Sequence, residues 1–198
     1  MDNPGINLIV ALPSEARPLN QLLGLKRQQP DGLLPVYRRG DISLVISGPG
    51  ASAAHRGVEY LQAERPCSAP AWFNIGIAGH LCHPLGTAVL ASEVRAAEKN
   101  QSWRLTPPRH LNAQIGPVQT CAEPVSEYPG DCSYDMEAAS FVASAQRYAP
   151  LERIQVLKII SDNRENPTAA INAKMVRNLI RKQAVLINQL LREMIEPA

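Results

Sequence analysis

Short apolar runs closed by Pro, Gly or polar residues recur along this chain and are its strongest structural signal. Such runs are typical of strands buried on both faces of a sheet, because neither face then alternates with polar positions. They occur at residues 6–12, 71–77, 87–93 and 154–160. Two further segments, 34–38 and 42–46, flank Gly40-Asp41 and predict a β-hairpin.

Helix signals fill the segments between these strands. Ser14 is a suitable N-cap, Gly48-Pro49-Gly50 precedes a run rich in small residues, and Thr168 precedes a long amphipathic segment. We expect helices over about residues 15–25, 51–64, 135–148 and 169–195. Helices that alternate with buried strands predict an α/β fold, and nothing divides the chain, so we expect one domain over residues 1–198. The pattern is weakest over 95–132, where short apolar pieces occur only near 115–120.

Composition excludes several classes of protein. The 198 residues contain 20 Lys and Arg against 18 Asp and Glu. The basic residues are dispersed, and the cluster at 177–182 is interpreted as the solvated face of a helix, so we expect no nucleic-acid partner. No run reaches the ~20 apolar residues of a membrane span. The N-terminus has neither a basic start nor an apolar stretch, so we expect no signal peptide and a cytoplasmic location.

Cysteines and histidines give no strong metal or disulfide signal. The four cysteines are scattered, which favours reduced thiols. His80 and His83 are separated only by Leu81-Cys82, a spacing at which a zinc site is conceivable. Because no further convergent ligand is evident, we expect neither a metal nor an organic cofactor.

Two acidic positions in the second half of the chain suggest chemistry. Asp162 follows the buried run 154–160, and carboxyl ends of such strands are where α/β folds bind ligands. Glu137, preceded by Met136, lies at the predicted start of a helix and is expected to point into the same crevice. Two carboxylates in one cleft suit the cleavage of a sugar–heteroatom bond, since one handles a proton and the other holds hydroxyls or charge.

Five motifs in order resemble the nucleoside phosphorylase/nucleosidase superfamily, in its methylthioadenosine/S-adenosylhomocysteine nucleosidase branch. Each alone is weak, but together they span most of the chain. They are Ile9-Val10-Ala11-Leu12-Pro13-Ser14-Glu15, Ile46-Ser47-Gly48-Pro49-Gly50, Phe73-Asn74-Ile75-Gly76-Ile77-Ala78-Gly79, Met136-Glu137-Ala138 and Ile160-Ser161-Asp162. The resemblance implies a three-layer αβα sandwich with a central mixed sheet, of the phosphorylase/hydrolase-like kind, and a homodimer.

The resemblance also implies the roles of individual residues. Asp162, oriented by Ser161, would protonate a purine leaving group, and Glu15 would activate the attacking water. Met136 and Glu137 would hold the ribose. The other residues expected at the substrate are Ser47, Gly48, Gly50, Asn74 and Gly76. Asn74 stands where bacterial-type phosphorylases carry a phosphate-binding Arg, so water is favoured as the nucleophile, although Arg17, Arg38 or Arg56 remain as other sources of charge.

The chain also departs from this family. Ile77 stands where many members have Ser, the 95–132 region is short, and Glu123-Pro124 occupies a place where a base-stacking Phe is expected. The chain is similar, too, to the hopanoid-associated phosphorylase group. The favoured function is hydrolysis of the N-glycosidic bond of a purine, 5′-modified adenosine-like nucleoside. The alternatives are a phosphate-dependent nucleoside phosphorylase of the hopanoid-associated type and a non-catalytic nucleoside-binding module.

Overall fold

The computed structural model describes residues 5–28, 32–67 and 70–194. The strands are β1 (Ile6–Val10), β2 (Lys26–Arg27), β3 (Val36–Arg39), β4 (Ile42–Ile46), β5 (Ala71–His80), β6 (Ala88–Ala96), β7 (Gln101–Arg104), β8 (Gln114–Thr120), β9 (Ser133–Asp135) and β10 (Ile154–Asp162). The helices are α1 (Pro13–Leu23), α2 (Ala51–Glu64), α3 (Ala138–Ala145), α4 (Ala173–Lys182) and α5 (Ala184–Glu193). Short 3₁₀ turns cover Leu151–Arg153 and Thr168–Ala170.

β5 is the centre of the sheet. It runs parallel to β1 on one side and to β10 on the other, and its last two residues pair with β9 in the antiparallel sense. β10 continues to β6, β6 to β8, and β8 returns to β9, so these five strands close into a ring of pairings. β1 continues outwards through β4, β3 and β2. The result is a mixed sheet that is open at one side and closed at the other.

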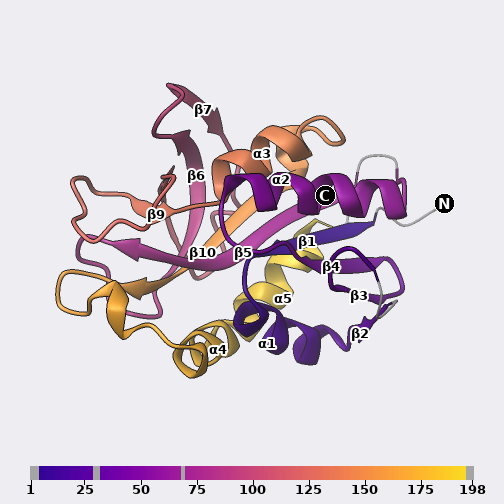
Figure 1. The fold of residues 1–198 in the computed structure, drawn as a ribbon, viewed down its shortest axis with the longest axis horizontal. Coiled ribbons are helices and arrows are strands. Elements are labelled where there is room, and N and C mark those ends of the chain that lie inside the picture. The colour runs from indigo at the N-terminus through magenta and orange to yellow at the C-terminus, as the bar shows by residue number, and fades with distance from the viewer. Residues whose placement is uncertain (1–4, 29–31, 68–69, 195–198) are drawn as a thin grey trace.

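Helices cover both faces of this sheet, as Figure 1 shows, with α2 and α3 above it and α1, α4 and α5 below. Two apolar clusters correspond to the two layers. The lower one joins Leu19 of α1 and Ile187 of α5 to the sheet, and the upper one joins Val58 of α2 and Phe141 of α3 to it. Strands β1, β5 and β10 are buried almost throughout, as expected for strands covered on both faces. The expected αβα layering with a central mixed sheet is therefore confirmed.

Several predicted boundaries are wrong. Leu12, not Ser14, is the N-cap residue of α1, because Pro13 takes the first helical position, where its missing N–H costs nothing. The long C-terminal helix is divided at Gln183 into α4 and α5, and its N-cap is Asn172, whose side chain accepts the Met175 N–H. Thr168 instead begins a 3₁₀ turn. Residue 195 lies outside the described part of the chain.

The weakly patterned region contains more structure than expected. β7 and β9 both arise within or next to it, and β8 extends over Gln114–Thr120. Because Asp135 belongs to β9, the following helix begins at Ala138 rather than at Asp135. These strands are short and their pattern is not alternating, so the pairing partners decide their conformation. Within the described residues, no helix is long and apolar enough to span a membrane.

Candidate active site

A cavity of about 180 Å³ lies beyond the carboxyl ends of the parallel strands β1, β5 and β10. The same ends of parallel strands meet at one edge of a sheet, which is where open α/β folds bind ligands. The lining includes side chains from α1, β5, β10 and the β9–α3 junction. Those that the sequence singled out are Glu15, Met136, Glu137, Ser161 and Asp162.

Three backbone N–H groups hold Glu15. Its Oε2 accepts from Ala11 and Leu12, both at 2.9 Å, and its Oε1 accepts from Ile77 at 3.0 Å. Only 2% of the residue is exposed. Burial raises the pKa of Glu15 to about 7, against the opposing effect of these backbone donors and of Lys158. A carboxyl group with this pKa accepts a proton readily near neutral pH, which is the property of a general base.

Glu137 occupies the N-cap position of α3 and faces the start of another helix. Its Oε1 accepts the backbone N–H of Gly50, the N-cap residue of α2, at 2.7 Å. Burial raises its pKa, and Asp135 adds to this, whereas Lys158 opposes it. The N-terminus of a helix carries partial positive charge, so this carboxylate is fixed where it is electrostatically favoured. The neighbouring Met136 lines the cavity beside it.

Asp162 ends β10 and is surrounded by hydroxyl groups. Its Oδ1 accepts from Ser161 at 2.5 Å, and its Oδ2 accepts from Thr168 at 2.8 Å and from Tyr128. Ser161 Oγ also lies 3.3 Å from the Ala78 carbonyl, which ties it to β5. Asp162 is 4% exposed. Three hydroxyl donors therefore fix the orientation of this carboxyl group at the cavity wall.

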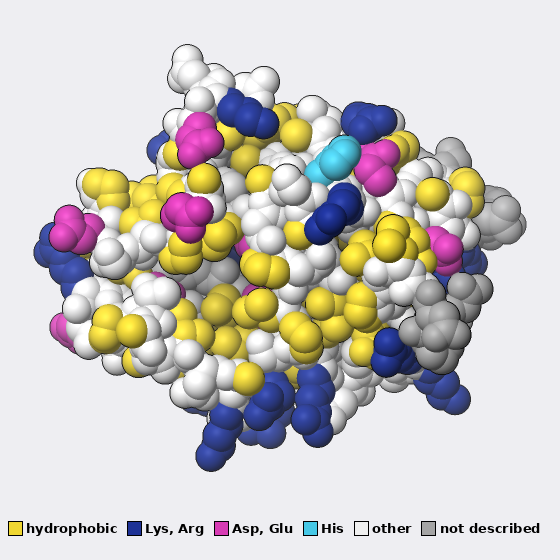
Figure 2. Space-filling view, viewed as in Figure 1, with side chains coloured by type: hydrophobic (Ala, Val, Ile, Leu, Met, Phe, Trp, Pro, Cys, Tyr) yellow, Lys and Arg dark blue, Asp and Glu magenta, His cyan; other side chains and the backbone are white. Residues whose placement is uncertain are grey.

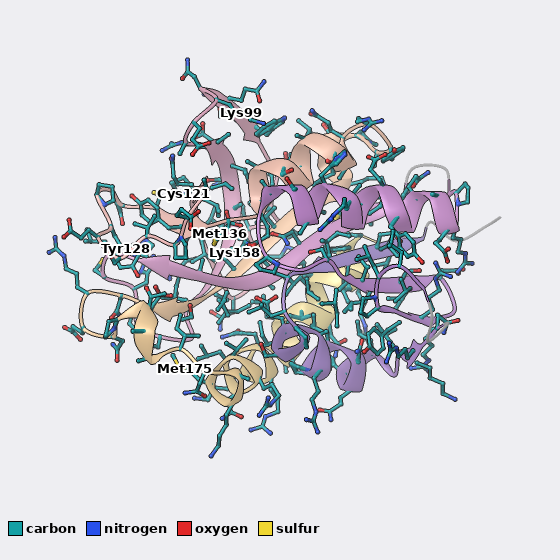
Figure 3. All side chains as sticks on the ribbon, viewed as in Figure 1. Lys99, Cys121, Tyr128, Met136, Lys158 and Met175 are labelled. Atoms are coloured by element: carbon teal, nitrogen blue, oxygen red, sulfur yellow. The ribbon has the colours of Figure 1, made fainter. Side chains whose placement is uncertain are left out.

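The buried side chain of Lys158 forms an ion pair with Asp135, one of the carboxylates at the cavity. Lys158 Nζ lies 2.7 Å from Asp135 Oδ2, and both side chains are at most 1% exposed. Burial alone would lower the pKa of Lys158, but Asp135 and Glu137 outweigh it and hold that pKa above its ordinary value. Asp135 also accepts from Thr120 Oγ1 at 2.6 Å and from the Ala138 N–H at 2.8 Å. Figure 3 shows Lys158 and Met136 in the central part of the fold.

The cavity is acidic on its inner surface. In the described part of the chain, the charged residues that line it are all carboxylates: Glu15, Glu123, Asp135, Glu137 and Asp162. Lysines and arginines gather elsewhere, and Figure 2 shows them along the lower edge of this face, near α1 and α4. The cavity therefore favours neutral or cationic ligand groups over anions.

The remaining predicted substrate residues are not among those that line the cavity: Ser47, Gly48, Gly50, Asn74 and Gly76. Ser47 Oγ donates to the carbonyls of Val10 and Gly48, and Asn74 Nδ2 donates to the Ile9 carbonyl at 3.2 Å. Gly50 contributes its N–H to Glu137. Ser47 and Asn74 thus tie the segment after β4 and strand β5 to strand β1.

Steric crowding explains why residue 76 is glycine. A Cβ atom at this position would lie 2.9 Å from Glu15 Oε1, closer than such atoms approach in proteins. The absent side chain lets the Glu15 carboxylate lie against β5, where it reaches the Ile77 N–H. Gly76 therefore leaves the space that the Glu15 carboxylate occupies.

His80, Cys82 and His83 form a compact turn after β5. Their potential ligand atoms all lie within 4.8 Å of one another. However, His80 Nδ1 accepts the N–H groups of Cys82 and His83, each at 3.2 Å, and the two imidazole rings stack with centroids 3.9 Å apart. The lone pair of His80 Nδ1 thus already accepts two N–H groups, and His80 Nε2 lies 3.5 Å from Asp131 Oδ1. This geometry favours a structural turn over a metal centre.

Four residues of the site were missed or misread in the sequence. Asp135 directly precedes Met136, and Lys158 is a lone charge inside a β-branched run, which is a usable signal for a buried ion pair. Thr168 was interpreted as a helix cap. Tyr128 lies in the weakly patterned region, about 34 residues before its partner, and no local pattern connects the two.

Comparison with known proteins identifies solved structures that share this fold. The sequence matches no known protein family and no curated protein. Solved structures do match: the 5′-methylthioadenosine/S-adenosylhomocysteine nucleosidase of Helicobacter pylori has a TM-score of 0.79 at 14% identity, over 98% of this chain and 100% of that one. The 5′-methylthioadenosine nucleosidase of Arabidopsis thaliana has a TM-score of 0.84 at 15% identity, over 100% and 98%.

A third match is the futalosine hydrolase of Helicobacter pylori, with a TM-score of 0.77 at 14% identity, over 96% of this chain and 98% of that one. The chain therefore has the same fold as these two nucleosidases and futalosine hydrolase, in agreement with the fold that the five motifs led us to expect. At these identities the likeness establishes the fold, and the chemistry has to be argued from the residues of the cavity.

Proposed function

We propose that this protein is a purine nucleosidase that uses water to cleave the N-glycosidic bond of a 5′-modified adenosine-like nucleoside. The observation that carries the proposal is that Glu15, Glu137 and Asp162 converge on one cavity in three different environments. Glycoside hydrolysis needs a proton donor for the leaving group, a group that prepares the nucleophile, and contacts to the sugar hydroxyls. Each of the three carboxyl groups suits one of these tasks.

Asp162 is proposed as the general acid. A purine leaves poorly as an anion, so transfer of a proton to its imidazole-ring nitrogen lowers the barrier as the C–N bond breaks. Ser161 and Thr168 hold the carboxyl group at the cavity wall. A fixed donor does not have to be oriented during the reaction, which is worth part of the barrier.

Glu15 is proposed to prepare the water. Its pKa of about 7 leaves a substantial ionised fraction at neutral pH while keeping the group basic enough to accept a proton. The three backbone N–H groups fix both oxygens near the ends of β1 and β5. Water attacking an oxocarbenium-like carbon needs only modest help from a base.

Glu137 and Met136 are proposed to hold the ribose. A carboxylate is an acceptor with two oxygens, and the 2′- and 3′-hydroxyls present two donors. Gly50 holds Oε1 of Glu137, and we propose that Oε2 accepts from the diol. The Met136 thioether offers an apolar and adaptable surface for the sugar.

The acidic lining supports water over phosphate as the nucleophile. A phosphate dianion in this cavity would approach several carboxylates, and like charges at short range in a poorly solvated cavity repel strongly. The nearest buried cation in the described residues, Lys158, is already paired with Asp135. This agrees with Asn74, whose amide lacks the charged fork that binds phosphate.

The test is release of the purine base from a panel of 5′-substituted adenosines, followed by absorbance in phosphate-free buffer. The proposal expects turnover of at least one nucleoside by the wild-type protein and base release slower by about 10²–10⁴-fold in Asp162→Asn. Tight binding of adenine or of a nucleoside, measured by thermal shift, without any release of base would show a binding module and overturn the proposal. The expected homodimer and cytoplasmic location remain predictions.

A further inference from the structure

Charge is unevenly distributed over the fold. Residues 16–28 and 166–192, which include most of α1, β2, α4 and most of α5, contain eight of the 20 Lys and Arg residues and none of the 18 Asp and Glu residues. α1 and α4 pack against each other below the sheet. Figure 2 shows Lys and Arg side chains along this lower edge, with no acidic side chains among them. The edge is therefore positively charged, although the net charge of the whole chain is only +2.

The outer side of α4 is basic along its whole length. Lys174, Arg177 and Arg181 are three and four residues apart, a spacing that places side chains on one side of a helix. The buried residues of α4 lie on the opposite side, in the lower apolar cluster. With exposed neighbours on α1 and at the end of α4, these cations form the basic face, which consists of Arg17, Lys174, Arg177, Arg181 and Lys182.

The cations of the basic face have no acidic partners. Within the residues that the structure describes, none of the five takes part in an ion pair, and Arg181 donates only to the neutral side chain of Asn178. Exposed arginines elsewhere differ, because Arg65, Arg95 and Arg147 each lie within 3.0 Å of a carboxylate oxygen. The basic face is therefore free to contact anions outside the molecule.

The stability of α4 does not account for all of these cations. Arg181 and Lys182 lie in its last turn, where the helix dipole favours positive charge. Lys174 lies in the first turn, where the dipole disfavours it, and like charges three or four residues apart repel one another. Lys174 and Arg177 thus weaken the helix that carries them. An anionic partner on the basic face would offset this repulsion.

We propose that the basic face docks this protein onto a membrane surface that contains anionic phospholipids. Two helices side by side present their cations along one edge of the molecule, which suits an extended anionic surface. α1, α4 and α5 contain no Phe, Tyr or Trp, so this side has no aromatic platform on which nucleic-acid bases could stack. The apolar side of α4 is buried in the core, so the contact is electrostatic and the helix does not insert.

The expected binding is weak, reversible and sensitive to salt. Each Lys or Arg close to an anionic bilayer strengthens binding by about fivefold, so the loss of two cations should weaken it by about 25-fold. The attraction falls off over about 10 Å at 0.1 M salt and over a shorter distance at higher salt. Docking through this face does not require the proposed nucleosidase activity.

The test is flotation of the full chain with vesicles of phosphatidylcholine, with or without about one third phosphatidylglycerol, at about 0.05 M and about 0.5 M salt. Wild type should bind only the anionic vesicles, and only at low salt. Arg177→Gln combined with Arg181→Gln should bind about 25-fold more weakly, whereas the two Arg→Lys changes at these positions should retain binding. The matched control is Arg56→Gln with Arg104→Gln, which removes the same charge from α2 and β7 and should bind like wild type.

Thermal melting followed by circular dichroism shows whether each variant is folded. Failure of wild type to bind anionic vesicles, or an equal loss of binding in the two Arg→Gln pairs, would overturn the inference. Tighter binding of wild type to single-stranded RNA than to the vesicles, lost in the Arg177 and Arg181 pair, would assign the face to nucleic acid and overturn it as well. Base release has no part in these measurements, so the nucleosidase proposal is tested separately.

Discussion

At the scale of single residues, three carboxyl groups in one cavity differ by what holds them. Backbone N–H groups hold Glu15, a helix N-terminus holds Glu137, and hydroxyl groups hold Asp162. The three groups therefore have different hydrogen-bond partners, and we propose that they serve as base, sugar contact and acid. The sequence predicted these three positions, but it contained no information on their different surroundings.

The first prediction concerns Asp162→Asn. The amide keeps the shape of the side chain but cannot deliver a proton, so base release should fall by about 10²–10⁴-fold. The fold should survive, since the hydroxyl groups of Ser161, Thr168 and Tyr128 can donate to or accept from an amide. The matched control is Asp41→Asn in the exposed β3–β4 turn, which should keep full activity. Near-normal turnover in folded Asp162→Asn would remove this residue from the mechanism.

The second prediction concerns the pH dependence of stability caused by Glu15. Its pKa rises from 4.5 to about 7 on folding, so in this window the folded state holds a proton that the unfolded state has released. Stability therefore falls as pH rises from about 4.5 to about 7, by up to about 3 kcal/mol from this group. Glu15→Gln lacks the titration.

Chemical denaturation of wild type and Glu15→Gln across this window measures the effect. The free energy of unfolding of wild type, relative to that of the variant, should decrease as pH rises from about 4.5 to about 7 and stay constant at higher pH. The variant itself should be less stable at every pH, because an amide N–H₂ would face one of the backbone donors of Ala11, Leu12 or Ile77. A difference that does not change with pH would show that Glu15 titrates normally.

At the scale of elements, β10 carries both the proposed acid and a buried cation. Lys158→Met should destabilise the protein by about 3–5 kcal/mol, because Asp135 would be left as a buried charge without its counterion. Lys174→Met, at an exposed position of α4, should change the free energy of unfolding by no more than about 0.5 kcal/mol. Combining Lys158→Met with Asp135→Asn should restore part of the loss. Equal effects of Lys158→Met and Lys174→Met would contradict this account.

The elements also show how far the sequence alone reaches. Apolar runs predicted β1, β5, β6 and β10, and the Gly40-Asp41 turn predicted the β3–β4 hairpin. β7 and β9 were missed because pairing with β6, β8 and β5 stabilises them rather than their own composition. The break between α4 and α5 could not be predicted, because no Gly or Pro occurs at it in the sequence. Tyr128 was missed for the same reason as β9, since only the closed ring of strands places it against Asp162.

At the scale of the whole molecule, most of the residues of the candidate site come from the closed side of the sheet. β9 pairs with the end of β5 and leads into Asp135, Met136 and Glu137 at the cavity, and β10 of the same ring delivers Asp162. Glu15 comes from α1, on the open side. The resulting cavity is lined by carboxylates, and the cations of the chain lie mostly on the outer surface. We propose that a cavity of this charge binds a neutral nucleoside and water and disfavours phosphate.

The sugar product formed in the presence and absence of inorganic phosphate tests this central claim most directly. With a nucleoside that the protein cleaves, the rate of base release should not depend on the phosphate concentration, and the product should be the free pentose under all conditions. Base release only after phosphate is added, with ribose 1-phosphate as the product, would contradict the account and identify the protein as a phosphorylase.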